Sequence, residues 1–230
     1  MSGLAFFDFD KTLLRKESGE LIALPIGVRG LVHPWAGLRF LASGLMYKLG
    51  RVSREDMQFI GYSTYRGGRL DTLITTLDGL WEGTMVPGLS PAVLARLREH
   101  QALGHGSWVL TASPTYVAAA AKRGLGVDGV VGTRMEVGGD GRLTGEPFLP
   151  LMQGPEKARV VHEVAAEAGV GLDDCWAYSD SMADVEMLEA VGHPVAVSPD
   201  PVLRELANRK GWELIEHDAI TPLSKQGQTL

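Results

Sequence analysis

The chain has 230 residues, 45% of them hydrophobic and 22% charged, which suits one globular domain with a sizeable insertion. Its 28 acidic side chains outnumber 22 basic ones, and the net charge of −6 argues against a nucleic-acid partner. The single cysteine, Cys175, excludes an intramolecular disulfide and indicates a reducing compartment. No signal peptide is recognisable, and prolines and arginines interrupt the most apolar stretch, 21–47, so we expect a cytoplasmic protein without stable membrane insertion.

The first predicted element is a short buried strand over residues 4–9, bounded by Gly3 and Asp10. Ser90 and Pro91 form a favourable helix start, and the strand 107–110 follows that helix. The remaining predicted strands are 127–131, 175–178, 195–197 and 212–215, the helices are 116–122, 156–168, 182–191 and 201–210, and a hairpin spans 134–143. This alternation predicts an α/β fold with a doubly wound, mostly parallel, Rossmann-like sheet.

One interval, from about residue 13 to residue 85, breaks the alternation. It contains several apolar, helix-like stretches and no convincing strand. We therefore predict a core domain formed by residues 1–14 and 86–218, with a helical cap domain, 15–85, inserted after the first strand. Residues 219–230 form a polar C-terminal tail.

The first strand ends in Asp8 and Asp10, which places two carboxylates at the carboxyl edge of a parallel sheet, where ligands bind in such folds. Two carboxylates this close repel each other unless a cation lies between them or one takes a proton. Both conditions suit phosphoryl transfer, with Mg²⁺ as the cation, one carboxylate as nucleophile and the other as acid. The alternative is that both acids only cap a turn.

Three further motifs occupy corresponding places. Residues Thr111, Ala112 and Ser113 follow a strand and offer a hydroxyl and backbone N–H groups to an anion, although hydroxyl residues are also common helix caps. Lys157 lies in the first turn of a helix, where its charge opposes the helix dipole, which suggests a specific role.

The last motif contains two aspartates four residues apart. Asp180 and Asp184 follow the strand 175–178 at the start of the next predicted helix, within reach of one point above the sheet. Carboxylates in this arrangement suit a hard divalent cation, although acids at helix starts also stabilise helices.

In order and spacing, these four motifs resemble the haloacid dehalogenase superfamily, specifically its phosphoserine-phosphatase-like branch. The resemblance implies that Asp8 is the nucleophile that forms an aspartyl-phosphate and that Asp10 is the general acid and base. It also implies that Thr111 and Lys157 bind the phosphoryl group, with Ala112 and Ser113 in the same loop. The Mg²⁺ ligands would be Asp8, the backbone carbonyl of Asp10, and Asp180, with Asp184 hydrogen-bonded to the ligand shell.

The chain departs from the branch pattern at Ala183, where phosphoserine phosphatases carry asparagine, and this puts phosphoserine specificity in doubt. Within the cap, Glu17 aligns with a glutamate that binds the substrate amino group in that branch. Arg66 lies roughly where an arginine binds the substrate carboxylate. For both residues the alternative is ordinary surface charge.

The function that we predict is hydrolysis of a small phosphorylated metabolite, similar to phosphoserine or histidinol phosphate. The cap is apolar and basic, so a lipid phosphate of the phosphatidylglycerophosphate type is an alternative substrate, although packing of the cap's own core explains most of its apolar residues. A phosphotransferase and a non-catalytic binding protein are the remaining alternatives; all five acidic and basic motif residues are present, which argues against the latter.

Overall fold

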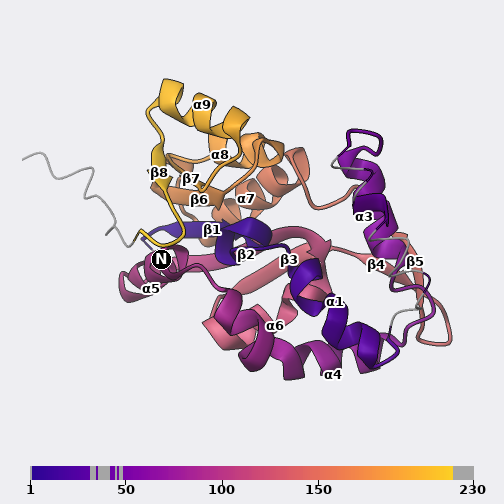
Figure 1. Cartoon of the computed structure of the whole chain (residues 1–230). Helices are drawn as coiled ribbons and strands as arrows, with labels where there is room; N and C mark the ends of the chain where they lie inside the picture. The colour runs from indigo at the N-terminus through magenta and orange to yellow at the C-terminus, as the bar shows by residue number, and fades with distance from the viewer. Residues whose placement is uncertain (1, 32–34, 36–41, 45, 47–48, 220–230) are drawn as a thin grey trace, which may run out of the picture.

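The computed structural model describes residues 2–31, 35, 42–44, 46 and 49–219. Within this part of the chain, six parallel strands form one sheet in the order β3-β2-β1-β6-β7-β8 (Figure 1). These strands are β1 (Leu4–Asp8), β2 (Gly106–Pro114), β3 (Gly129–Thr133), β6 (Cys175–Ser179), β7 (His193–Val197) and β8 (Glu213–Ile215). The fold class predicted from the sequence, an α/β protein with a doubly wound parallel sheet, is confirmed.

Helices cover both faces of this sheet. The β1 side chains from Leu4 to Phe7 are all apolar, and they are buried on both faces. In β1, the side chain of Phe7 packs with α5 (Pro91–Ala102) and α6 (Thr115–Leu125). The neighbouring Phe6 packs on the opposite face. That face is covered by α7 (Pro155–Ala168), α8 (Val185–Glu189) and α9 (Pro201–Lys210). Burial on two faces explains why the first strand reads as a continuous apolar run rather than an alternating one.

The described part of the insertion is helical, as predicted, apart from an isolated bridge between Arg69 and Arg142. Its elements are α1 (Ser18–Val28), α3 (Arg54–Ser63), α4 (Leu70–Leu80) and a π-helical turn η2 (Trp81–Met85). A 3₁₀ turn, η3 (Val86–Gly88), follows where the predicted core resumes. A bridge between Leu14 and Leu89 joins the two connections to the sheet domain. We keep the division into a core and a cap near residues 14 and 86 as a proposal that this bridge favours.

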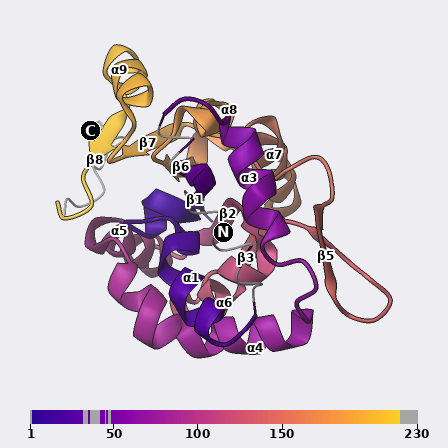
Figure 2. The ribbon, with the colours of Figure 1, turned by 45° about the vertical axis from the view of Figure 1, so that its right-hand side comes forward.

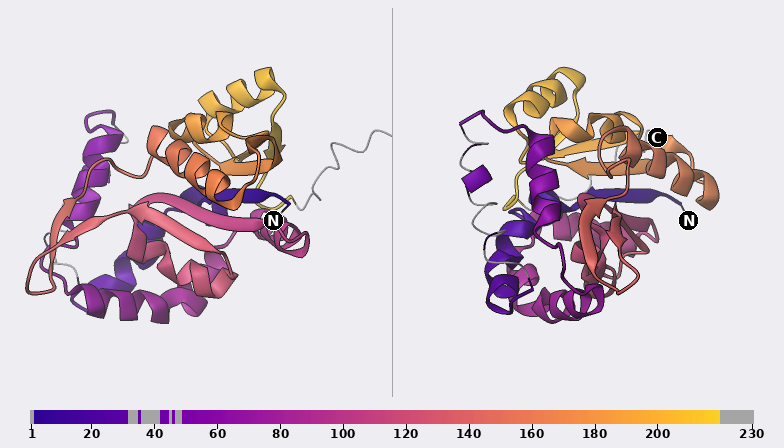
Figure 3. Two further views of the ribbon diagram at one scale, coloured as in Figure 1. Left: turned by 180° about the vertical axis from the view of Figure 1, so that it is seen from behind. Right: turned by 90° about the vertical axis from the view of Figure 1, so that its right-hand side faces the viewer.

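Two parts of the cap are placed differently. Helices α1 and α4 lie beside α6 (Figure 2), and Ile22, Ile26, Leu73 and Leu77 belong to the same buried cluster as the β1 and β2 side chains. Helix α3 instead stands beside the hairpin formed by β4 (Met135–Val137) and β5 (Leu143–Pro147) (Figure 3). The buried apolar side chains of α1 and α4 are therefore explained by one core that the cap shares with the sheet domain.

Some predicted element boundaries were wrong. The predicted helix 182–191 is a 3₁₀ turn, η5 (Met182–Asp184), followed by the short α8, and the turn is fixed because Asp200 accepts a hydrogen bond from the Met182 N–H. The predicted strand 127–131 begins later, at Gly129, because Asp128 exchanges two hydrogen bonds with Ser107 at the start of β2. No helix in the described residues has the length and apolar character that crossing a membrane requires.

The contact between cap and core gives a stability prediction at Gly124 of α6. A Cβ atom built there would lie 2.0 Å from the indole Nε1 of Trp81, which is buried at the end of α4. Alanine normally stabilises a helix interior by about 1 kcal/mol relative to glycine. We expect Gly124→Ala to destabilise the protein by about 1–3 kcal/mol instead, because the indole must move.

Urea unfolding measures this difference. The matched control is Gly79→Ala in α4, where no atom lies within 4 Å of the new Cβ and a small gain in stability is expected. Equal gains for both variants would show that α6 does not pack against Trp81.

Candidate active site

The predicted site residues lie at the carboxyl edge of the sheet, where three neighbouring strands end. Asp8 is the last residue of β1, Thr111 is in β2 opposite the end of β3, and Ser179 ends β6 directly before Asp180. Lys157 reaches the same edge from the first turn of α7. Parallel pairing of the three strands therefore brings together residues that are more than 170 positions apart in the sequence.

A buried lysine links the first and last motifs. The Lys157 Nζ donates to Asp8 Oδ1 over 2.6 Å and to Asp184 Oδ2 over 2.7 Å, and all three side chains are almost fully buried. Thr12 donates to the other Asp8 oxygen, and Ser179 donates to Asp184 Oδ2 over 2.7 Å. Charge pairing in a dry environment explains why a lysine is retained at a helix start that its charge disfavours.

The ionisation of this cluster follows from its burial and from its charges. Burial raises the pKa of Asp8, Lys157 lowers it, and Asp184 and Asp180 raise it again, so the pKa lies well above the usual value. For Lys157, burial lowers the pKa, but Asp184 and Asp8 outweigh burial and leave the pKa raised. Lys157 is therefore firmly cationic, whereas ionised Asp8 needs further positive charge nearby.

Asp10 lies at a separate point, facing the cap. Its carboxylate accepts hydrogen bonds from the Ser18 N–H at the start of α1, from Ser113 Oγ over 2.6 Å, and from Thr111 Oγ1 over 3.4 Å. Burial raises the pKa of Asp10, and the nearby Glu17 raises it further. A carboxyl group that retains its proton more readily than usual, held by hydrogen bonds from three sides, suits a general acid.

Three acids and one lysine leave this pocket with an excess of negative charge, which fits a cation. Asp180 lies close enough to Asp8 for its charge to raise the Asp8 pKa. In the described residues, no three side chains of the His, Cys, Asp and Glu types form a metal-binding group. The predicted ligand set, with carboxylates from Asp8 and Asp180 and the backbone carbonyl of Asp10, stays a prediction.

The two predicted cap residues have other partners. Glu17 pairs with Lys11 over 2.5 Å and is half exposed, while its charge still reaches Asp10. Arg66 pairs over 2.5 Å with Glu146 of the hairpin and is largely exposed. The structure thus brings Glu17 near the site but ties Arg66 to β5, and the substrate-binding roles of both stay predictions.

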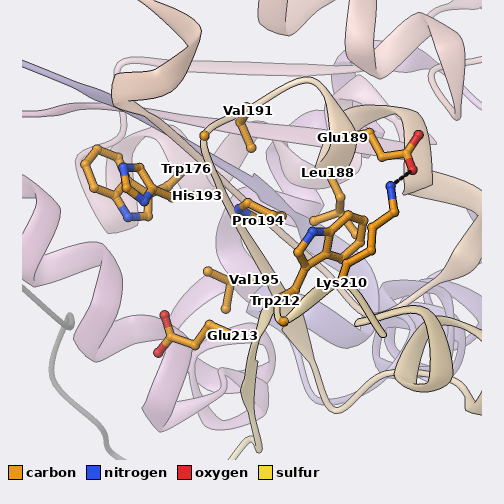
Figure 4. Close-up of a pocket in the computed structure, with 12 residues that line it drawn as sticks. Trp176, Leu188, Glu189, Val191, His193, Pro194, Val195, Lys210, Trp212 and Glu213 are labelled. Atoms are coloured by element: carbon orange, nitrogen blue, oxygen red, sulfur yellow. Dashed lines mark hydrogen bonds and ion pairs between the residues drawn. The ribbon is translucent and has the colours of Figure 1, made fainter. Parts of the chain in front are cut away.

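Two cavities lie away from these residues. One, of about 540 Å³, is lined by Trp176, His193 and Trp212 at the amino-terminal starts of β6, β7 and β8 (Figure 4). This is the edge of the sheet opposite to Asp8. The other, of about 620 Å³, lies between Phe59 of α3 and the loop that leads to α7. Neither is lined by the charged motif residues, so cavity size does not identify this site; its chemistry does.

Sequence reasoning missed several residues that hold the site. Thr12 and Ser179 adjoin the acidic motifs, and their hydroxyls could have been considered as partners of Asp8 and Asp184. Ser18 and Tyr62 carry no such signal. Tyr62, in α3, donates to the backbone carbonyl of Ala112 over 2.8 Å and so ties the cap to the predicted phosphate loop.

Comparison with known proteins identifies the family of the chain. Residues 5–189 match the family model of the haloacid dehalogenase-like hydrolases. A protein of Streptomyces azureus named "Inhibition of morphological differentiation protein" is 34% identical over 92% of this chain and 77% of its own length. Phosphoserine phosphatase SerB1 of Mycobacterium tuberculosis is 30% identical, over 93% of this chain and 70% of its own. Histidinol-phosphatase of Neisseria meningitidis is 25% identical, over 94% and 99% of the two chains.

Among solved structures, a protein with unknown function from Bordetella pertussis Tohama I is similar, with a TM-score of 0.80 and 29% identity. The match covers 94% of this chain and all of that chain. The chain belongs to the haloacid dehalogenase-like hydrolases. Within that family it is a phosphatase.

Proposed function

We propose that this protein is a Mg²⁺-dependent phosphatase that hydrolyses a small phosphate monoester through an aspartyl-phosphate on Asp8. The observation that carries the proposal is the buried contact of Lys157 with both Asp8 and Asp184, at the edge where Asp180 also lies. A salt bridge that only stabilised the fold would not need a third acid, Asp180, beside the two that Lys157 contacts, because an excess of negative charge in a buried site is unfavourable.

In the first step, a carboxylate oxygen of Asp8 attacks phosphorus and the bond from phosphorus to the ester oxygen breaks. Asp10 gives its proton to the departing alcohol oxygen. In the second step, water attacks the phosphorus of the aspartyl-phosphate, Asp10 takes a proton from that water, and inorganic phosphate leaves with Asp8 restored. Lys157 holds the Asp8 carboxylate and provides positive charge for the phosphoryl oxygens.

Asp8, the Asp10 backbone carbonyl and Asp180 would hold the Mg²⁺. When bound, the ion supplies positive charge that keeps Asp8 ionised and neutralises the phosphoryl group. Asp184, through its contacts with Lys157 and Ser179, fixes the cluster around that position. Thr111, Ala112 and Ser113 lie beside Asp10 and would face the phosphate, with the Thr111 and Ser113 hydroxyls turned toward Asp10. The Ser113 N–H donates to the Thr111 hydroxyl, so it would have to leave that partner to bind a phosphate oxygen.

For the substrate, the names of two relatives point to small phosphorylated metabolites, phosphoserine and histidinol phosphate. The lipid-phosphate alternative has no support among the relatives named above.

The test of the proposed function is hydrolysis of a panel of phosphate esters with Mg²⁺ and after its removal by a chelator. Release of phosphate that stops with the chelator and returns with Mg²⁺ is expected; no release from any ester, or full rates with the chelator present, would refute the proposal.

The assignment of Asp10 as general acid gives a prediction about leaving groups. We expect Asp10→Asn to reduce the hydrolysis of alkyl phosphates by about 10²–10⁴-fold, because an alkoxide needs a proton to depart. The reduction for p-nitrophenyl phosphate, whose leaving group needs little protonation, should be much smaller. Steady-state kinetics on both esters measures the difference, and equal losses would remove Asp10 from the role of acid.

The pH dependence follows from the raised pKa of Asp10. The proton that the acid must donate is bound below this pKa and lost as the pH rises through it, so kcat for alkyl phosphates should fall on the alkaline side. This limb should be absent in Asp10→Asn.

A further inference from the structure

The cavity of about 540 Å³ at the amino-terminal edge of the sheet is walled by aromatic rings. The Trp176 ring stacks on that of His193, with centroids 4.2 Å apart and an angle of 13° between the ring planes. Trp212 lies on the other side of Pro194 (Figure 4). All three aromatic residues are partly exposed, so a molecule that enters the cavity can contact them. The volume is that of a typical small-molecule site.

Two carboxylates line the same cavity. Glu189 is the last residue of α8 and Glu213 is the first residue of β8. Their side chains are 44% and 30% exposed, so both carboxylates can be reached from the cavity. Flat aromatic faces beside negative charge attract organic cations, because the electrons of the ring face and the carboxylate both interact favourably with an ammonium group.

The chain itself places an ammonium group in this cavity. The Lys210 Nζ lies 5.4 Å from the centroid of the Trp212 ring and pairs with Glu189 over 2.5 Å (Figure 4). It thus makes the two contacts that an external ammonium would make. The Lys210 side chain is 43% exposed, and an ion pair as exposed as this one adds little stability, so Lys210 can leave the cavity at low cost.

The other carboxylate has a partner that cannot leave. Glu213 accepts a hydrogen bond from Arg96, whose side chain is only 1% exposed. A carboxylate has two oxygens and can accept from more than one donor, so this bond does not prevent Glu213 from binding a second cation. The carboxyl end of α9, at Lys210, also favours positive charge through the helix dipole.

We infer that this cavity is a second binding site of the protein and that its ligand is an aliphatic diamine. One ammonium takes the place of the Lys210 ammonium between Trp212 and Glu189, and the other pairs with Glu213. An anion would face two carboxylates and is excluded. The site lies at the edge of the sheet opposite to Asp8, so the inference does not depend on the proposed function.

The experiment is a titration of the full chain with 1,5-diaminopentane at saturating Mg²⁺, followed by the indole N–H resonances in ¹H–¹⁵N NMR spectra. We expect the Trp212 resonance to shift until it saturates, while that of Trp81, buried in the cap, stays in place. 1,5-Pentanediol, which has the same length and no charge, should cause no shift. No shift with the diamine, or an equal shift with the diol, would overturn the inference.

Substitutions separate this site from general attraction to an acidic protein. Lys210→Met removes the internal competitor and should tighten diamine binding by about fivefold, whereas Glu189→Gln should weaken it by about fivefold. The matched control is Arg209→Met, which removes the same charge from α9 at a residue that pairs with Glu205 outside the cavity; its affinity should equal that of the wild type. Equal gains for Lys210→Met and Arg209→Met, or no gain for Lys210→Met, would refute the site.

A further variant distinguishes the cavity from the candidate active site. Asp180→Asn removes a carboxylate near Asp8 and should leave the Trp212 shift and the diamine affinity unchanged. If binding is lost in Asp180→Asn, the diamine binds among the acids of the candidate active site and the second site is refuted. Failure of the protein to hydrolyse any phosphate ester would refute the proposed function without affecting this inference.

Discussion

Asp8→Asn is expected to reduce phosphate release by at least about 10⁴-fold while the protein stays folded. An amide cannot form the acyl-phosphate. Among the described residues, the second carboxylate that contacts Lys157 is that of Asp184. The fold should tolerate the change, because the raised pKa of Asp8 means that burial already disfavours its charged form. A neutral side chain of the same shape removes that cost while its oxygen still accepts from Lys157.

Two measurements check this expectation. Phosphate release gives the activity, and urea unfolding at neutral pH should show a midpoint equal to or higher than that of the wild type. Asp173→Asn, at an exposed position before β6, is the control and should leave both values unchanged. Residual turnover near the wild-type rate would contradict the assignment of Asp8 as nucleophile.

Lys157→Met is expected to affect both activity and stability. Removing the ammonium leaves Asp8 and Asp184 buried without their shared partner, and breaking a buried ion pair costs about 3–5 kcal/mol. Loss of the charge that faces the phosphoryl group should also lower kcat by about 10³-fold. The control is Lys122→Met on the exposed face of α6, for which neither effect is expected.

The stability loss in Lys157→Met should depend on pH. In the wild type, the raised pKa of Lys157 means that its stabilising charge is complete below about 10.5, the unfolded value, and is lost as the pH rises through the folded one. Without Lys157, Asp8 takes up a proton more readily when folded than when unfolded, because burial raises its pKa. Stability of the variant should therefore rise as the pH falls from 7 toward 5, and a flat profile would show that the lysine does not offset the burial of Asp8.

Much of the fold could be predicted because strongly patterned segments decide it locally. The continuous apolar run before Asp8 and the Ser90–Pro91 helix start were recovered with small boundary errors. Errors arose where contacts with distant segments fix an end, as the Asp200 side chain does at Met182 and the Ser107 backbone does at Asp128. The predicted cap was helical in its described residues, but it is not independent of the core, since Trp81 packs on Gly124.

The sequence by itself determined the chemistry of this protein: which acids, which lysine and which hydroxyl follow the strands, and in what order. Local patterns suffice for this, because the carboxyl ends of parallel strands share one edge wherever the chain forms such a sheet. Only the tertiary structure decided the partners of these groups. It gave Lys157 two carboxylates at once and tied Arg66 to the hairpin, and among the described residues it left the Tyr116 hydroxyl buried without a hydrogen-bond partner. Those contacts join residues far apart in the chain, and their strength comes from burial, which no local pattern of residues specifies.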